Sequence, residues 1–237
     1  MASWIIHLRI ADKLLDQIPG LDVTAFVVGN IAPDSGIPNA DGTTYTPTKA
    51  ITHYKTKRNN TVIYDVEWFA NERLTPKLIQ SYTKREFSFY LGYWAHLMTD
   101  QAWVNKICLP AFDRYGKSTQ EERNALVSIM KHDWYDLDFR YLRDHPSFRA
   151  FHIYSLASNF NNDFMPIFPE NAFELRRQSV CAFYSEQRTS LDREYPYFSP
   201  QQADSFVDTT TQTILTKVSC FRFPAEIPCE TSMTMLQ

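Results

Sequence analysis

Two histidines in the sequence are each followed, four residues later, by an aspartate. The first pair is His96 and Asp100 in Gly-Tyr-Trp-Ala-His-Leu-Met-Thr-Asp, and the second is His132 and Asp136 in Lys-His-Asp-Trp-Tyr-Asp. With 6 His and 27 acidic residues in a chain of 237, chance gives fewer than one such pair. On a helix this spacing puts an imidazole and a carboxylate on one face, where both can bind one metal ion. The spacing therefore predicts metal sites on two helices.

Both pairs lie in segments with helical periodicity. The first falls in a helix expected over residues 76–107, on a face that also carries Phe89 and Trp103. The second falls in a helix expected over residues 118–143, which begins at overlapping capping-box signals and carries Ile129 on the same stripe as the pair. Because these faces are largely apolar, an unpartnered charge there would be costly. A buried metal ion would be the partner.

Helical patterns cover most of the remaining chain, and no alternating strand pattern competes over most of it. Further helices are expected over residues 3–18, 148–156, 171–187 and 200–218. The sequence therefore predicts an all-α fold, a single-domain multi-helix bundle over residues 1–223 with a loosely held C-terminal tail at 224–237.

Three segments have a less regular pattern. A short apolar segment over residues 23–28 is expected to stop at Gly29-Asn30. Residues 31–52 carry many Pro, Gly and Thr without periodicity, which predicts one long ordered loop. Residues 64–69 fit a strand or a helix, and the sequence does not decide between them.

Composition limits the classes of function. A net charge of −3 and a pI near 6.1 argue against a basic surface for phosphate backbones, so no stable nucleic-acid complex is expected. No apolar run is long enough for a transmembrane segment, and the N-terminal residues do not resemble a signal peptide. Four cysteines lack CxxC spacing and are expected to be free thiols: Cys108, Cys181, Cys220 and Cys229. These features predict a cytoplasmic protein, and they leave its oligomeric state open.

Additional histidine and aspartate positions extend the first pair. His7 stands in Trp-Ile-Ile-His-Leu-Arg-Ile-Ala-Asp, Asp34 in Gly-Asn-Ile-Ala-Pro-Asp-Ser, and His53 in Thr-His-Tyr, all ahead of His96 and Asp100. In this order, over residues 4–138, the chain resembles the zinc-dependent phospholipase C family, which is related to the S1/P1 nucleases. The resemblance implies the helical fold of those enzymes, with a zinc cluster that hydrolyses phosphate esters.

The resemblance also implies a ligand set for two zinc ions. Asp34, His53, His96 and Asp100 would hold one ion, and Asp100 would bridge to a second ion that His7 also binds. Two close zinc ions can lower the pKa of a bridging water and direct the resulting hydroxide at phosphorus. Asp34 and Asp100 are therefore expected to be catalytic residues as well as metal ligands.

A third zinc ion is implied at His132 and Asp136, but the sequence departs from the family there. The family's N-terminal tryptophan amine is replaced by the internal Trp4, and a second family histidine is replaced by Lys106. The third ion would then be absent or would take a substitute ligand, for which the candidates are Asp133 and Asp113.

The expected substrate is a small phosphorylated molecule or a phospholipid headgroup, cleaved by phospholipase C-like phosphodiesterase chemistry. Basic residues flank His53 and either attract the phosphate or form a solvated loop face: Lys49, Lys55, Lys57 and Arg58.

Two alternative functions remain at this stage. His132-Asp133 is an adjacent pair like the centre of HD-type metal phosphohydrolases, which are also helical, although that interpretation gives Asp34 and His53 no role. The other alternative is a non-catalytic, zinc-stabilised helical scaffold or binding protein. The lost family ligands favour the scaffold, and the preserved set around His96 disfavours it.

Overall fold

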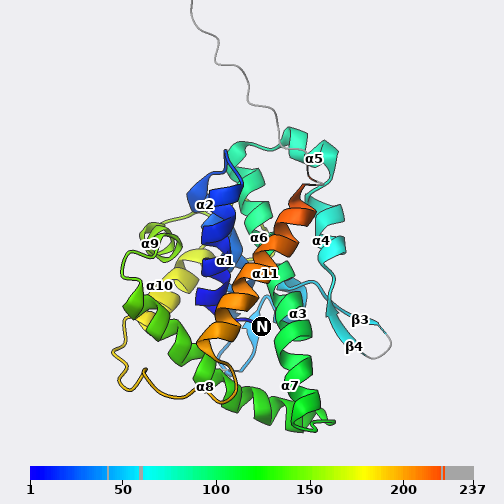
Figure 1. Ribbon diagram of the computed structural model, residues 1–237. Helices are drawn as coiled ribbons and strands as arrows, with labels where there is room; N and C mark the ends of the chain where they lie inside the picture. Colours follow the sequence, from blue (N-terminus) through cyan, green and yellow to red (C-terminus); the bar gives the residue numbers. More distant parts are fainter. Residues whose placement is uncertain (42, 59–60, 220, 222–237) are drawn as a thin grey trace, which may run out of the picture.

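Helices dominate the computed structural model, which describes residues 1–41, 43–58, 61–219 and 221 (Figure 1). The predicted all-α class is confirmed. The helices are α1 (Trp4–Gln17), α2 (Val23–Ile31), α3 (Lys49–Thr52), α4 (Val66–Arg73), α5 (Pro76–Ser81), α6 (Lys84–Trp103), α7 (Leu109–Arg114), α8 (Gln120–Asp144), α9 (Arg149–Leu156), α10 (Ala172–Tyr184) and α11 (Pro200–Val218). The shorter elements are the 3-10 helix η1 (Ala32–Asp34), the π-helix η2 (Val104–Cys108) and the strands β1 (Ile37–Pro38), β2 (Tyr45–Thr46), β3 (Lys55–Arg58) and β4 (Thr61–Tyr64).

The long helix expected over residues 76–107 is several consecutive segments. Thr83 starts α6 with a capping box, because its hydroxyl accepts the Glu86 N–H at 3.2 Å and the Glu86 carboxylate accepts the Thr83 N–H at 2.8 Å. This second start signal separates α5 from α6. At the other end the helix does not stop at residue 107, because Pro110 lies in the first turn of α7, where a missing N–H is tolerated.

Helices α2 and α6 cross in backbone contact through two glycines. A Cβ atom on Gly29 would lie 2.2 Å from the carbonyl oxygen of Phe89, and one on Gly92 would lie 2.1 Å from that of Phe26. No larger residue fits at either position. The prediction that Gly29-Asn30 ends the apolar segment was therefore wrong. Gly29 serves the helix contact, and α2 continues so that Asn30 reaches α6.

The predicted long loop at residues 31–52 is ordered but contains short elements. It includes η1, an antiparallel β1–β2 pair with Ile37 opposite Thr46, and α3. Asp34 is the last residue of η1, and His53 directly follows α3. The loop prediction was thus wrong about regular structure, although the segment carries two of the predicted site residues.

The undecided segment at residues 64–69 contains both a strand end and a helix start. Strands β3 and β4 pair antiparallel from Lys55 opposite Tyr64 to Arg58 opposite Thr61. Directly afterwards, the Asp65 side chain accepts the Trp68 N–H at 2.9 Å and caps α4.

The remaining predicted helices are found close to their expected bounds, as α1, α8, α9, α10 and α11. The buried face of α8, however, differs from the expected stripe, since Ile129 is 49% exposed. The apolar residues of α8 that are buried are Leu126, Met130, Trp134, Leu137 and Phe139. This face turns His132 toward solvent.

Asp138 is a buried carboxyl on α8 that connects three helices. It accepts hydrogen bonds from the Ser3 hydroxyl at 2.8 Å, at the start of α1, and from the Tyr184 hydroxyl at 2.6 Å, at the end of α10. Burial raises the pKa of Asp138 to about 7, although both hydrogen bonds act in the opposite direction.

Replacing Asp138 with asparagine is expected to change the pH dependence of stability. The folded pKa lies above the ordinary value of 3.8, so the contribution of the protonated carboxyl is complete below that value and is lost as the pH rises toward 7. Asparagine does not titrate. The free energy of unfolding of the variant, relative to the wild type, should therefore increase by about 1.4 kcal/mol per pH unit across this window. Denaturant unfolding at several pH values measures the trend, and a constant difference between the two proteins would contradict it.

Among the described residues, no helix combines the length and apolar character needed to cross a membrane. Within the same part of the chain, Cys108 and Cys181 are free, as expected. Cys220, Cys229 and the predicted tail at 224–237 lie outside the described residues. The division into a domain and a tail stays a prediction.

Candidate metal centre

Five buried side chains from four segments meet inside the helical fold. They are His7 on α1, Asp34 in η1, His53 after α3, and His96 and Asp100 on α6. Asp34 is 4% exposed and the other four are fully buried. The structure therefore brings together all five residues that the sequence analysis assigned to two zinc ions.

The nitrogen and oxygen atoms of these side chains are spaced like ligands of shared ions. The Nε2 atoms of His96 and His53 are 3.3 Å apart, and His53 Nε2 lies 3.5 Å from Asp34 Oδ1. Asp100 Oδ2 lies 3.6 Å from His53 Nε2 and 3.7 Å from His96 Nε2, while its Oδ1 lies 3.4 Å from His7 Nε2. Two tetrahedral ligands about 2.0–2.1 Å from one zinc ion are roughly 3.4 Å apart. The observed spacing fits this geometry.

These atoms form two overlapping groups. His7, His96 and Asp100 make one, and Asp34, His53 and His96 make the other, each with its ligand atoms within 4.8 Å of one another. The rings of His7 and His96 are stacked, with centroids 3.8 Å apart and planes 3° from parallel. His96 is thus the residue that the two groups share.

Hydrogen bonds at Nδ1 hold two of the three histidine rings, those of His96 and His53, with Nε2 facing the centre. His96 Nδ1 lies 2.7 Å from the backbone carbonyl of Asn30, which can only accept, so Nδ1 carries the proton. Burial, together with the neighbouring His7, lowers the pKa of His96 to about 3, so the ring is neutral near pH 7. His53 Nδ1 similarly lies 2.9 Å from the Thr52 hydroxyl. A neutral ring held in this way offers the Nε2 lone pair as a metal ligand.

In each of the two carboxylates, Asp34 and Asp100, one oxygen accepts a hydrogen bond and the other has no hydrogen-bond partner among the described residues. Trp4 Nε1 donates to Asp34 Oδ2 at 2.9 Å, and the backbone N–H of Ala2 donates to Asp100 Oδ1 at 2.9 Å. In the described part of the chain, Asp34 Oδ1, Asp100 Oδ2 and both ring nitrogens of His7 are buried without a hydrogen-bond partner. Buried polar atoms left in this state are costly. A metal ion at the centre would satisfy the two oxygens and His7 Nε2, so the donor set fits zinc.

Asp34 stays ionised although it is buried. Burial alone would raise its pKa, but the adjacent His53 and His96 rings and the Lys49 ammonium hold that pKa well below its usual value. The Lys49 ammonium lies 3.7 Å from Asp34 Oδ1. The carboxylate is therefore in the form that binds a metal ion.

The sequence analysis missed three residues that orient the ligands. Trp4 precedes His7 by one helical turn, and this spacing was a usable signal that its indole shares the face of the site. Thr52 directly precedes His53. Asn30 orients His96 through its backbone carbonyl, for which a side-chain pattern carries no signal.

The structure does not bring the second pair to this centre. His132 is exposed, and Asp136 Oδ2 instead accepts from Arg193 Nη2 at 2.7 Å, while its Oδ1 lies 3.3 Å from Arg188 Nη1. Lys106 reaches Thr209 on α11, with 3.2 Å between Nζ and Oγ1. Neither His132 nor Asp136 belongs to a candidate metal group in the described residues, and the third zinc ion there stays a prediction.

The substitute ligands are also placed elsewhere. Asp133 Oδ1 accepts from Arg193 Nη1 at 2.8 Å, and its Oδ2 accepts the Tyr197 N–H at 2.7 Å, so both oxygens hold the 193–198 segment to α8. Asp113 is exposed. His132 and Asp133 belong to neither candidate metal group in the described residues. The structure therefore does not support the metal centre on which the HD-type alternative depends.

Replacing His132 with alanine is expected to leave the metal content of the purified protein unchanged. The side chain is exposed and stands outside both candidate metal groups, so its removal deletes no ligand of the centre. Elemental analysis of variant and wild type, purified side by side without chelator, measures this. Loss of about one equivalent of zinc would instead restore the third site that the sequence analysis expected.

A cavity of about 230 Å³ adjoins the centre at Asp34. Its wall includes Trp4, Lys49, Lys131 and Trp134. Of the predicted basic residues, Lys49 lines this cavity, and the Lys55 ammonium lies 5.0 Å from the centroid of the Tyr64 ring. The side chains of Lys57 and Arg58 lie outside the described part of the structure.

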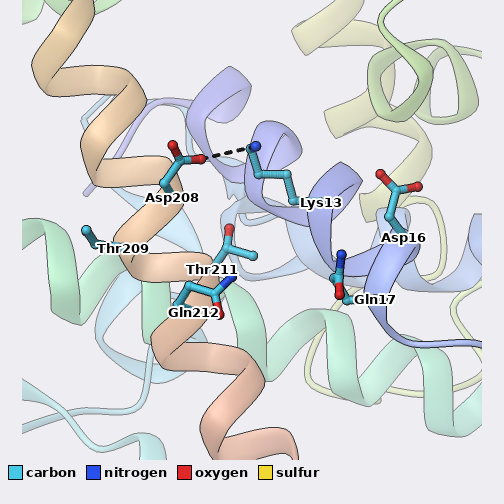
Figure 2. A pocket seen from close by; sticks show the side chains of 7 residues that line it. All are labelled: Lys13, Asp16, Gln17, Asp208, Thr209, Thr211 and Gln212. Atoms are coloured by element: carbon cyan, nitrogen blue, oxygen red, sulfur yellow. Dashed lines mark ion pairs between the residues drawn. The ribbon is translucent and has the colours of Figure 1, made fainter.

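A second hollow of about 490 Å³ lies between α1 and α11 (Figure 2). Lys13 and Asp208 face each other across it, with 3.1 Å between Nζ and Oδ1. None of the five clustered residues lines it. By contrast, Asp34 lines the cavity of about 230 Å³.

Comparisons with known proteins agree with this geometry. A family model described as zinc dependent phospholipase C matches residues 6–170, a segment that contains all five clustered residues. No curated protein and no solved structure shows a significant match to the chain.

Proposed function

The chain belongs to the zinc-dependent phospholipase C family, and from this premise we propose that it is a zinc-dependent hydrolase of phosphate esters. The single observation that carries the proposal is the set of buried nitrogen and oxygen atoms at the centre. Asp34 Oδ1, Asp100 Oδ2 and the His7 ring nitrogens have no hydrogen-bond partner in the described residues. Both oxygens lie 3.5 to 3.7 Å from the Nε2 atoms of His53 or His96, and His7 Nε2 lies 3.4 Å from Asp100 Oδ1.

We assign the five residues His7, Asp34, His53, His96 and Asp100 to two zinc ions. Asp100 lies against His7 through Oδ1 and against His53 and His96 through Oδ2, which suits a carboxylate that contacts both ions. Zinc held there would polarise a phosphoryl oxygen and lower the pKa of the attacking water.

The protein's own side chains orient these ligands and the reactants. Trp4 holds one oxygen of Asp34, which leaves the other free, and Asn30 fixes the tautomer of His96. Asp34 is the one member of the set that also lines the adjoining cavity. It is therefore placed to orient the water that attacks phosphorus and to accept its proton.

The substrate class follows as a finer proposal. We expect a small phosphorylated molecule or a phospholipid headgroup, because the cavity at Asp34 has a volume of about 230 Å³. A cytoplasmic location and the absence of a stable nucleic-acid complex stay predictions from the sequence.

An activity screen with the zinc-loaded protein tests the function. We expect hydrolysis of at least one of three chromogenic esters: 4-nitrophenyl phosphate, bis(4-nitrophenyl) phosphate and 4-nitrophenyl phosphorylcholine. A chelator should abolish the activity and added zinc should restore it, because the reaction depends on the ion. A protein that binds zinc but hydrolyses none of the three would contradict the proposal and favour a zinc-stabilised scaffold.

A further inference from the structure

The cavity at Asp34 combines aromatic walls with two ammonium groups. Trp4, Trp134 and Tyr135 contribute aromatic side chains, and Lys49 and Lys131 contribute positive charge. Asp34 is the one acidic residue in its wall among the described residues.

The charge balance of this cavity changes when the centre is filled. Lys49 Nζ lies 3.7 Å from Asp34 Oδ1, so the ammonium now faces a free carboxylate oxygen. Once a cation takes that oxygen, the carboxylate charge is neutralised by the ion. Lys49 and Lys131 then contribute positive charge to a wall that holds no second acidic residue among the described ones, and they favour an anionic ligand.

The aromatic walls are largely committed to protein contacts. The Arg176 guanidinium lies 5.5 Å from the centroid of the Trp4 ring, and Phe183 packs edge-on against that ring at 6.0 Å. Trp134 packs edge-on against Trp103 with 5.0 Å between centroids. A cage for a quaternary ammonium needs several free aromatic faces and no competing cation. This cavity meets neither condition.

We propose that the cavity selects phosphate esters with a dianionic phosphate group over zwitterionic esters that carry a quaternary ammonium, with Lys49 and Lys131 as the residues that set this preference. This inference rests on the proposed function. In the reaction, the oxygen of water bonds to phosphorus, the ester P–O bond breaks, and the alcohol leaves with one proton of the water. The dianionic group has two sources, a soluble phosphomonoester or a phosphatidate headgroup in a membrane.

Steady-state kinetics of the zinc-loaded full chain test the preference. The wild type is expected to have a higher kcat/KM for 4-nitrophenyl phosphate than for 4-nitrophenyl phosphorylcholine. Lys131→Met should raise KM for 4-nitrophenyl phosphate about tenfold with kcat changed less than about twofold. The reason is that the variant loses a charged hydrogen bond to the phosphate group, which the bound substrate and the transition state make equally. Lys77→Met, an exposed lysine on α5 that does not line the cavity, is the matched control. A preference for the phosphorylcholine ester, or an unchanged KM in Lys131→Met, would overturn the inference.

Binding of inorganic phosphate separates this inference from the proposed function. If the wild type hydrolyses no ester, the proposed function fails, and calorimetry still measures phosphate affinity for the zinc-loaded protein. A loss of about tenfold in phosphate affinity in both Lys49→Met and Lys131→Met would support the inference. Equal phosphate affinity in the wild type and both variants would contradict it.

Vesicles identify the source of the dianionic group. Phosphate release from phosphatidate vesicles, but not from matched phosphatidylcholine vesicles, would support the inference with a lipid substrate. Activity on 4-nitrophenyl phosphate alone would support it with a soluble substrate. Faster cleavage of phosphatidylcholine vesicles than of phosphatidate vesicles would overturn it.

Discussion

Replacing Asp100 with asparagine is expected to lower phosphate-ester hydrolysis by about a thousandfold or more, while the protein still folds. The two oxygens of Asp100 face three histidines, at 3.4 Å from His7, 3.6 Å from His53 and 3.7 Å from His96. Loss of the carboxylate charge therefore weakens both proposed metal positions at once. Elemental analysis beside steady-state kinetics measures the two effects together.

The substitution is chosen because it preserves the local hydrogen bonds. An asparagine oxygen can still accept the Ala2 N–H that Asp100 Oδ1 now accepts. Its amide N–H groups would face His96 Nε2, which is unprotonated because Nδ1 carries the proton. The variant should thus melt cooperatively even without zinc. Asp163→Asn, at an exposed carboxylate, is the matched control and should keep both metal and activity.

A variant at Asp100 that keeps near-wild-type activity would remove this residue from the proposed mechanism. Loss of activity with full zinc content would give Asp100 a catalytic role but deny it the role of a ligand to both ions.

Removal of zinc with a chelator is expected to lower the melting temperature by about 10 °C. A site filled at about a thousand times its Kd contributes roughly 4 kcal/mol, and a domain of this size shifts by about 2–4 °C per kcal/mol. The reason lies in the centre, where the unpartnered oxygens of Asp34 and Asp100 and the His7 nitrogens stay buried when the ion is lost.

Differential scanning calorimetry with chelator, and then with added zinc, measures this shift and its reversal. The Asp100→Asn variant provides the control, since it should show a much smaller response to zinc. A melting temperature that does not respond to chelator in the wild type would contradict a buried zinc centre.

The proximity of the five side chains could be predicted because they stand at diagnostic positions in the sequence. His96 and Asp100 share a face of α6 by their spacing alone, and the family order added His7, Asp34 and His53. The same spacing at His132 and Asp136 does not bring that pair into either candidate metal group of the described residues. A four-residue offset places two side chains on one face but does not say which face is buried. On α8 the buried stripe runs through Leu126, Met130 and Trp134, one face away from His132.

Other features were missed because they depend on long-range contacts. Gly29 is a helix-stop signal in the local sequence, yet the backbone of α6 at Phe89 makes glycine necessary inside α2. The hairpin from Lys55 to Tyr64 carries no alternating hydrophobic pattern that would have marked it as strands. Lys131 carries no signal in the local sequence, because it reaches the cavity at Asp34 only through the packing of α8.

Anomalous diffraction at the zinc absorption edge, from crystals of protein purified without chelator, tests the central claim most directly. We expect strong anomalous peaks among His7, Asp34, His53, His96 and Asp100, with zinc–nitrogen distances of about 2.0–2.1 Å to His96 and His53. Two peaks would agree with the proposed ligand assignment. A zinc peak at Asp136 with none at His96, or no peak at all in protein that is active, would contradict it.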